Sequence, residues 1–192
     1  MKTLIVAVAV LVSSIASAQD TVKIQLSYSQ FQTAKAYAKS NVDIKKFESE
    51  LVDLINVYRK SKGLSVLVSD ANLVKASQIQ SDYMVAVNKV THKNTKVGFE
   101  TFTQRINHFF TGTYGVAVEN ACTGSLFLCS AENVTPAQQI FKIWKDSPGH
   151  DQNMSNPSIN KIGLTISRAP GEDYFYANFD AIDTTFNSVV TK

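Results

Sequence analysis

The sequence predicts an α+β sandwich, and three patterns support this fold class. Apolar residues recur at helical spacing between Asp43 and Lys60, and a capping box with a following proline opens another helix at Thr135. Near the C-terminus, one segment alternates apolar and polar residues as strands do, and the next is rich in aromatic and β-favouring residues. Helices therefore stand before and between a few strands, without the strand-helix-strand alternation of a doubly wound sheet.

The first 18 residues have the pattern of a secretory signal peptide. Lys2 precedes an apolar run from Leu4 to Val12, and Ala16-Ser17-Ala18 forms a cleavage site of small residues. The alternative is an N-terminal membrane anchor that is never removed. No later segment approaches the roughly 20 apolar residues of a membrane-spanning helix. We therefore expect a secreted or periplasmic protein with no transmembrane segment in the mature chain.

Cleavage after residue 18 leaves about 174 of the 192 residues, which suits one compact domain. We divide the mature chain into an N-terminal arm at 19–42, which is extended or partly helical, a domain at 43–186 and a tail at 187–192. The net charge of +3 is small and the lysines are scattered, so the overall charge indicates neither a nucleic-acid partner nor an anionic membrane.

The expected helices follow from periodicity and capping residues. The first covers 43–60 and ends before Gly63, the second begins at an Asp70 N-cap and reaches about Asn88, and the third covers 102–109. The helix that begins after Thr135 buries Ile140, Phe141 and Trp144, and the Ser147-Pro148-Gly149 break separates it from another that opens at His150.

The expected strands lie in the second half of the chain. A short one covers 116–118, and two longer ones cover 162–166 and 174–182 around a turn at 169–172. These last two predict an antiparallel hairpin.

The two cysteines, Cys122 and Cys129, predict a disulfide that closes a small loop. Exported proteins meet oxidising conditions, and the chain has no other cysteine. The alternative is a pair of thiolate metal ligands, although the spacing does not match the usual pairs.

Three ionisable residues occupy the ends of different expected elements. His92 follows the second helix, Glu119 ends the short strand, and His150 opens the helix after the break. Side chains at such ends converge in many sites, and two imidazoles with a carboxylate are suitable ligands for zinc or catalysts of acid–base chemistry. Arg105 either pairs with an acid beneath this cleft or lies on a solvated face, and His108 is expected to be a packed or capping residue.

The order of several short segments resembles the CAP superfamily (cysteine-rich secretory proteins, antigen 5 and pathogenesis-related 1) in its bacterial, SCP-like extracellular form. The resemblance runs from about Leu51 to Asp180. Its matching residues are Leu54-Ile55-Asn56, Arg59, Leu73, Ala76, Met84, Thr91-His92, Phe102, Arg105, Val118-Glu119-Asn120, Trp144, Ser147-Pro148-Gly149-His150, Asn153 and Lys161-Ile162-Gly163.

The resemblance implies a three-layer α-β-α sandwich with a small antiparallel sheet. It also implies that His92 and His150 are the two histidines of the family's cleft and that Glu119 is its G-E-N acid, with Val118 in place of the glycine. The family's second acid falls on Ser147, so a metal would have at most three protein ligands among the matched positions.

Our leading functional hypothesis is a secreted, non-catalytic module that binds a divalent metal such as zinc, or a small extracellular ligand, in a cleft lined by His92, Glu119, His150 and Ser147. The competing hypothesis is a secreted hydrolase, such as a metal-assisted peptidase, in which Glu119 and the histidines activate water. A third class is an adhesive domain that binds through its surface loops. The partner is a small molecule, a lipid or an extracellular protein.

Overall fold

A mixed four-stranded sheet forms the centre of the protein. The computed structural model describes residues 6–10 and 22–185. The strand order is β3 (Val68–Ser69), β5 (Lys161–Ser167), β6 (Tyr174–Ile182) and β4 (Ala117–Ser125). β3 is parallel to β5, and β6 is antiparallel to both of its neighbours, which confirms the predicted C-terminal hairpin.

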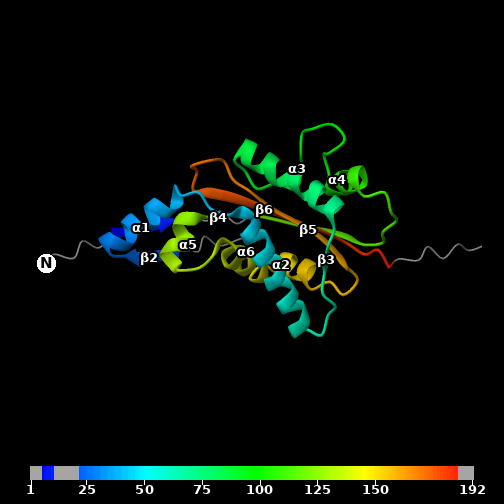
Figure 1. Cartoon of the computed structure of the whole chain (residues 1–192), viewed down its shortest axis with the longest axis horizontal. Helices are drawn as coiled ribbons and strands as arrows, with labels where there is room; N and C mark the ends of the chain where they lie inside the picture. The colour runs from blue at the N-terminus through cyan, green and yellow to red at the C-terminus, as the bar shows by residue number, and fades with distance from the viewer. Residues whose placement is uncertain (1–5, 11–21, 186–192) are drawn as a thin grey trace, which may run out of the picture.

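Seven helices in the described residues flank this sheet: α1 (Tyr28–Ala38), α2 (Ile44–Ser61), α3 (Ala71–Val87), α4 (Phe102–Phe109), α5 (Leu126–Glu132), α6 (Pro136–Lys145) and α7 (Pro148–Met154). In Figure 1, α3 and α4 lie on one side of the sheet, and α2 and α6 lie on the other. The predicted α+β fold with three layers is therefore confirmed.

The two faces of β6 differ in polarity. Phe175, Ala177, Phe179 and Ala181 belong to the apolar core on the α2 and α6 side, where the rings of Trp144 and Phe179 are 5.9 Å apart. The alternate residues include Asn178 and Asp180, both fully buried. Because side chains alternate across a strand, one face of β6 is a hydrophobic core and the other carries buried polar groups.

Side-chain caps explain where four helices begin. Asp43, Asp70, Thr101 and Thr135 accept hydrogen bonds from backbone N–H groups in the first turns of α2, α3, α4 and α6. Each such cap contributes about 1 kcal/mol. The helix starts predicted from Asp43, Asp70 and Thr135 are confirmed.

The N-terminal region contains more regular structure than the predicted arm. β2 (Val22–Leu26) precedes α1, and it pairs with β1 (Val6–Val10), which is part of the predicted signal peptide. The remainder of that peptide and the tail at 187–192 lie outside the described residues, and cleavage stays a prediction. Within the described ranges, no helix has the length and apolar character needed to cross a membrane.

The predicted disulfide is wrong for this structure, because Cys122 and Cys129 are both free thiols. The segment between them is not a small loop, since Cys122 lies in β4 and Cys129 lies in α5. Both are buried in the hydrophobic core. Burial raises the pKa of Cys122 well above its usual range and that of Cys129 to about 12, so both thiols stay protonated and neither suits a thiolate ligand.

Candidate functional site

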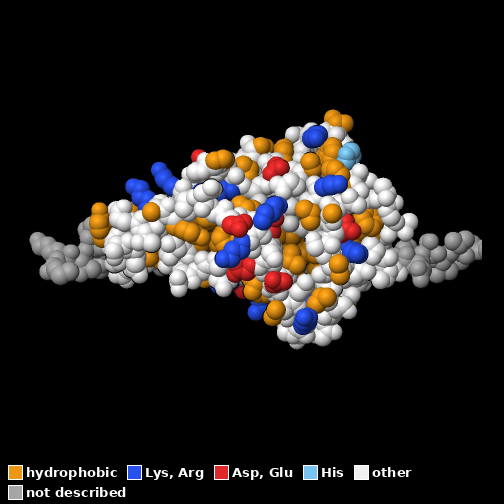
Figure 2. All heavy atoms as spheres, in the orientation of Figure 1, with side chains coloured by type: hydrophobic (Ala, Val, Ile, Leu, Met, Phe, Trp, Pro, Cys, Tyr) orange, Lys and Arg blue, Asp and Glu red, His pale blue; other side chains and the backbone are white. Residues whose placement is uncertain are grey.

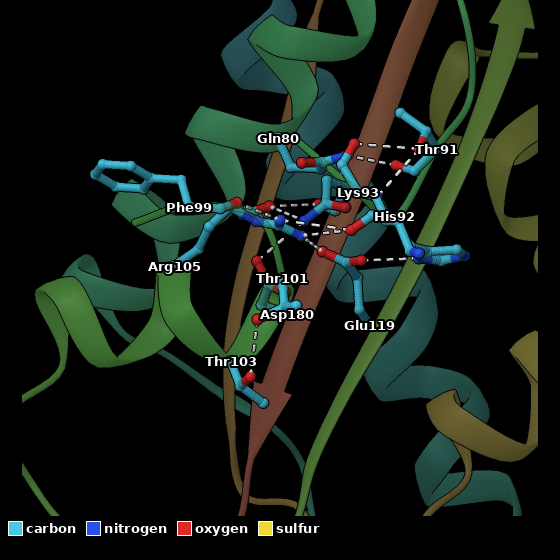
Figure 3. A network of polar contacts seen from close by, with 12 residues as sticks. Gln80, Thr91, His92, Lys93, Phe99, Thr101, Thr103, Arg105, Glu119 and Asp180 are labelled. Atoms are coloured by element: carbon cyan, nitrogen blue, oxygen red, sulfur yellow. Dashed lines mark hydrogen bonds and ion pairs between the residues drawn. The ribbon is translucent and has the colours of Figure 1, made fainter. Parts of the chain in front are cut away.

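Glu119 joins a histidine to a buried arginine. Its Oε1 lies 2.7 Å from His92 Nδ1, and its Oε2 accepts a hydrogen bond from Arg105 Nη2. Figure 3 shows Glu119 on β4 between His92 on the loop after α3 and Arg105 on α4. Arg105 is fully buried, so the solvated alternative for this residue is wrong and the buried pair with an acid is confirmed.

The loop that carries His92 is fixed by buried polar side chains. α3 ends at Asn88, which adopts the left-handed conformation with φ of 50°. Gln80 on α3 then donates a hydrogen bond to the carbonyl of Thr91. Arg105 also lies 3.5 Å from the carbonyl of His92. The backbone on both sides of the His92 Cα is therefore held, while its side chain remains 54% exposed.

A second set of contacts fastens α7 to β4. Asn153 Nδ2 donates to the Glu119 carbonyl at 3.1 Å and to Asn120 Oδ1 at 2.8 Å. Asn120 Nδ2 in turn donates to the His150 carbonyl at 3.0 Å. These amide contacts attach the backbone of His150 to the same strand that carries Glu119.

The two histidines have opposite electrostatic environments. The hydrogen bond to Glu119 raises the pKa of His92, against the smaller effects of burial and of Arg105. Burial lowers the pKa of His150, and the nearby His92 lowers it further. His150 Nδ1 is buried without a hydrogen-bond partner among the described residues. His150 is consequently the more neutral imidazole of the pair at any given pH.

A second buried carboxyl group lies beside Glu119 and was not identified from the sequence. Asp180 on β6 is the register partner of Glu119, and its Oδ2 accepts a hydrogen bond from Asn178 Nδ2 at 3.0 Å. Burial, followed by the charge of Glu119, raises the pKa of Asp180 well above its usual range. The signal in the sequence was an acid at an inward position of a strand whose neighbours Phe179 and Ala181 are apolar.

The arrangement of Glu119 limits its use as a metal ligand. Both of its carboxylate oxygens already bind protein donors, His92 and Arg105. Within residues 6–10 and 22–185, no three His, Cys, Asp or Glu side chains form a group that could hold a metal ion. The available donors for a cation are the two imidazoles, and Glu119 orients one of them, as outer-shell carboxylates do in metal sites.

Two other residues considered in the sequence analysis, Ser147 and His108, make no contact with Glu119 among the described hydrogen bonds. Ser147 is the N-cap residue of α7, but its side chain makes no capping hydrogen bond. It remains a predicted ligand-binding residue. His108 packs against Phe99 and Phe109, with ring centroids 4.6 Å apart in each pair, which agrees with its expected packing role.

The layers, the sheet order and the paired histidines define the class of α-β-α proteins that the sequence resembles. The sequence pattern of the cysteine-rich secretory protein family, CAP, matches residues 52–179, which is more than half of the chain. The chain belongs to this family.

The chain is also similar to a Bacillus protein in sequence and to solved structures in fold. The uncharacterized protein YkwD of Bacillus subtilis (strain 168) is 29% identical over 118 residues, which cover 62% of this chain and 41% of YkwD. An outer surface protein of Borrelia burgdorferi is 18% identical, with a TM-score of 0.62 and coverage of 76% of this chain and 98% of that protein. An extracellular protein containing a SCP domain, from Bacillus anthracis str. Ames, is also 18% identical, with a TM-score of 0.58 and coverage of 73% and 41%.

The chain therefore spans less than half the length of YkwD and of the Bacillus anthracis protein. A more distant structure is that of NaASP2 with Zn²⁺, at 12% identity, a TM-score of 0.47 and coverage of 74% and 82%. A similarity this distant does not show that the present chain binds a metal.

Proposed function

We propose that the chain is an extracellular, non-catalytic module in which His92 and His150 bind a divalent cation or a small ligand. The observation that carries the proposal is the 2.7 Å contact between His92 Nδ1 and Glu119. An extracellular location is supported by the signal-peptide pattern and by similarity to proteins described as extracellular or outer-surface.

Glu119 prepares His92 for binding by selecting its tautomer. A neutral His92 that donates its Nδ1 proton to Glu119 carries a free electron pair on Nε2. Because Glu119 is itself held by Arg105, the ring orientation is defined before a ligand arrives. The pKa of His150 is lowered, so its imidazole is a second ligand that needs no proton removed at neutral pH.

The peptidase alternative receives less support from the same contacts. A general base needs a carboxylate oxygen free to accept a proton from water. Both oxygens of Glu119 have partners, and its side chain is 2% exposed. We therefore assign Glu119 a positioning role, with the two imidazoles as the ligands and water in the remaining positions of a bound cation.

The test is calorimetric titration of Zn²⁺ into chelator-treated protein at a pH near 7.5, where imidazoles are mostly neutral. We expect saturable binding of about one ion, with weaker affinity than a closed four-ligand zinc site because only two protein ligands are offered. The variant His92→Ala/His150→Ala should lose this binding.

The matched control is His108→Ala, which removes the third histidine of the chain outside the proposed site. Equal loss of binding in this control would mean that zinc binds histidines without a specific site. Absence of binding to the folded wild-type protein would rule out the metal and leave the small-ligand form of the proposal to be tested by imidazole chemical shifts during ligand titration.

A further inference from the structure

A rigid turn in the loop between α3 and α4 displays an apolar side chain to solvent. Val97 is 87% exposed, more than any other large hydrophobic residue in the described ranges. The Phe99 N–H donates to the Lys96 carbonyl at 3.0 Å, and Gly98 has φ of +82°. These are features of a type II turn, which puts Val97 at a corner.

The exposure of Val97 is imposed by buried contacts on both sides of the turn. Phe99 is 8% exposed, and its carbonyl accepts a hydrogen bond from Arg105 at 3.1 Å. The buried Asn94 bonds to the Glu100 carbonyl through its N–H and to the Lys96 N–H through its side chain. The turn is thus anchored to the protein, and Val97 cannot fold back into the core without breaking these bonds.

Cationic and aromatic groups surround the turn. Lys96 Nζ lies 4.5 Å from the centroid of the Phe99 ring, whose other contacts include the exposed His108. Lys93 is also exposed on this loop, and no Asp or Glu occurs between Asp82 and Glu100. Figure 2 shows basic, histidine and hydrophobic side chains together at the upper right, over the α3–α4 region.

We infer that this surface, formed by Lys93, Lys96, Val97 and His108 and here called the loop patch, docks on an anionic phospholipid membrane. Lysines near a membrane surface are attracted to anionic headgroups, and an apolar side chain between them enters the boundary of the acyl chains. Aromatic rings with a polar edge prefer the same interfacial depth. A single exposed valine is ordinary on a protein surface, but the rigid turn, the cations and the absence of acids in this segment act together.

This inference is independent of the proposed ligand site. The test is vesicle flotation of the chain without residues 1–18. The described part of that segment, β1, pairs only with β2 and contributes no strand to the four-stranded sheet, so its removal leaves that sheet complete. Vesicles of phosphatidylcholine with phosphatidylglycerol are compared with vesicles of phosphatidylcholine alone, at low and at high salt. We expect binding to the anionic vesicles only, and we expect it to decrease as salt screens the charges.

Two variants locate the surface. Lys93→Gln/Lys96→Gln should weaken partitioning about 25-fold, from roughly fivefold for each lysine. Val97→Asp should weaken it by about tenfold or more, because the new charge opposes both insertion and the anionic headgroups. The matched control is Lys35→Gln/Lys39→Gln, which removes the same charge from exposed positions on and beside α1.

Three outcomes would overturn the inference. They are no binding to anionic vesicles at low salt, equal binding to neutral vesicles, and an equal loss in the α1 control, which would indicate attraction by net charge alone. Circular dichroism of each variant establishes that its fold is retained, so that a loss of binding reports on the surface.

Discussion

Two fully buried arginines lie on opposite sides of the sheet and are satisfied in different ways. Arg59 on α2 donates to four carbonyl groups, those of Ser65, Met154, Asn156 and Ile159, at 2.8 to 3.2 Å. No ion pair with a carboxylate is formed by Arg59 in the described structure, and burial lowers its pKa. Arg105 on α4 instead bonds to a carboxylate, Glu119, and to the Phe99 carbonyl.

This difference separates a structural role from a functional one. The carbonyls bound by Arg59 lie at the end of α7 and in the segments around β3 and β5, so Arg59 joins pieces of backbone. The charge of Arg105 acts on Glu119, whose other oxygen holds His92. Substitutions at the two arginines should therefore both reduce stability, but only a substitution at Arg105 should change the titration of His92.

The largest effect is expected for Arg59→Met. Methionine fills part of the volume but leaves four carbonyl groups without this donor, and those of Met154 and Ile159 belong to buried residues. Each buried, unsatisfied group costs about 1 to 3 kcal/mol before relaxation and water entry. We expect a loss of about 4 kcal/mol in the free energy of unfolding, measured by urea denaturation. The control Lys60→Met, at the neighbouring exposed position, should change it by less than about 0.5 kcal/mol. A loss below about 1 kcal/mol at Arg59 would contradict this interpretation.

A somewhat smaller loss is expected for Arg105→Met. Removal of one partner from a buried ion pair costs about 3 kcal/mol, and here Glu119 retains its hydrogen bond to His92. Arg105 lowers the pKa of His92 through its charge, so the variant should raise that pKa. An NMR titration of the imidazole signals measures the change. Arg59→Met is the matched comparison, and an equal shift of His92 in both variants would remove the distinction between the two arginines.

The sequence was sufficient to predict the elements that have local signals. Asp70 and Thr135 marked helix starts through short-range caps, and apolar periodicity marked the helix that follows Asp43. Aromatic and β-favouring residues from Tyr174 to Ile182 marked a strand. β3 has two residues and is defined by pairing with β5, so it has no local periodicity to detect. α5 has seven residues, and its place is determined by contacts with α1 and the core.

The sequence predicted which residues form the site more completely than it predicted the contacts between them. Family resemblance and position at element ends identified His92, Glu119 and His150. The alternatives for Arg105 remained open because its partner is 14 positions away and the pairing depends on how α4 packs against β4. Asp180 was missed because the register of β4 with β6, which puts it opposite Glu119, is a property of the folded sheet.

The smallest effect is the opposite response of the two histidines to pH. In the wild type, His92 should titrate above its usual pKa of about 6.5 and His150 below it. The stability contributed by His92 is then fully present below pH 6.5 and is lost as the pH rises through its folded pKa. His150 acts in the reverse sense. Its contribution to the stability of the protein is fully present above pH 6.5 and is lost as the pH falls through its folded pKa.

Glu119→Gln tests this balance, because the bond to Glu119 is the largest cause of the raised pKa of His92. The variant should lower the pKa of His92, so that acidification below pH 6.5 destabilises it more than the wild type. We expect the pH-dependent part of the change in the free energy of unfolding to be less than about 1 kcal/mol, since the His92 side chain is 54% exposed and solvent screens the pair. The loss of the buried carboxylate partner of Arg105 adds a pH-independent cost of about 3 kcal/mol. NMR titration gives the pKa of each imidazole, with His108→Ala used for assignment, and urea denaturation at two pH values gives the stability. An unchanged pKa of His92 in Glu119→Gln would mean that the carboxylate orients the ring without controlling its charge.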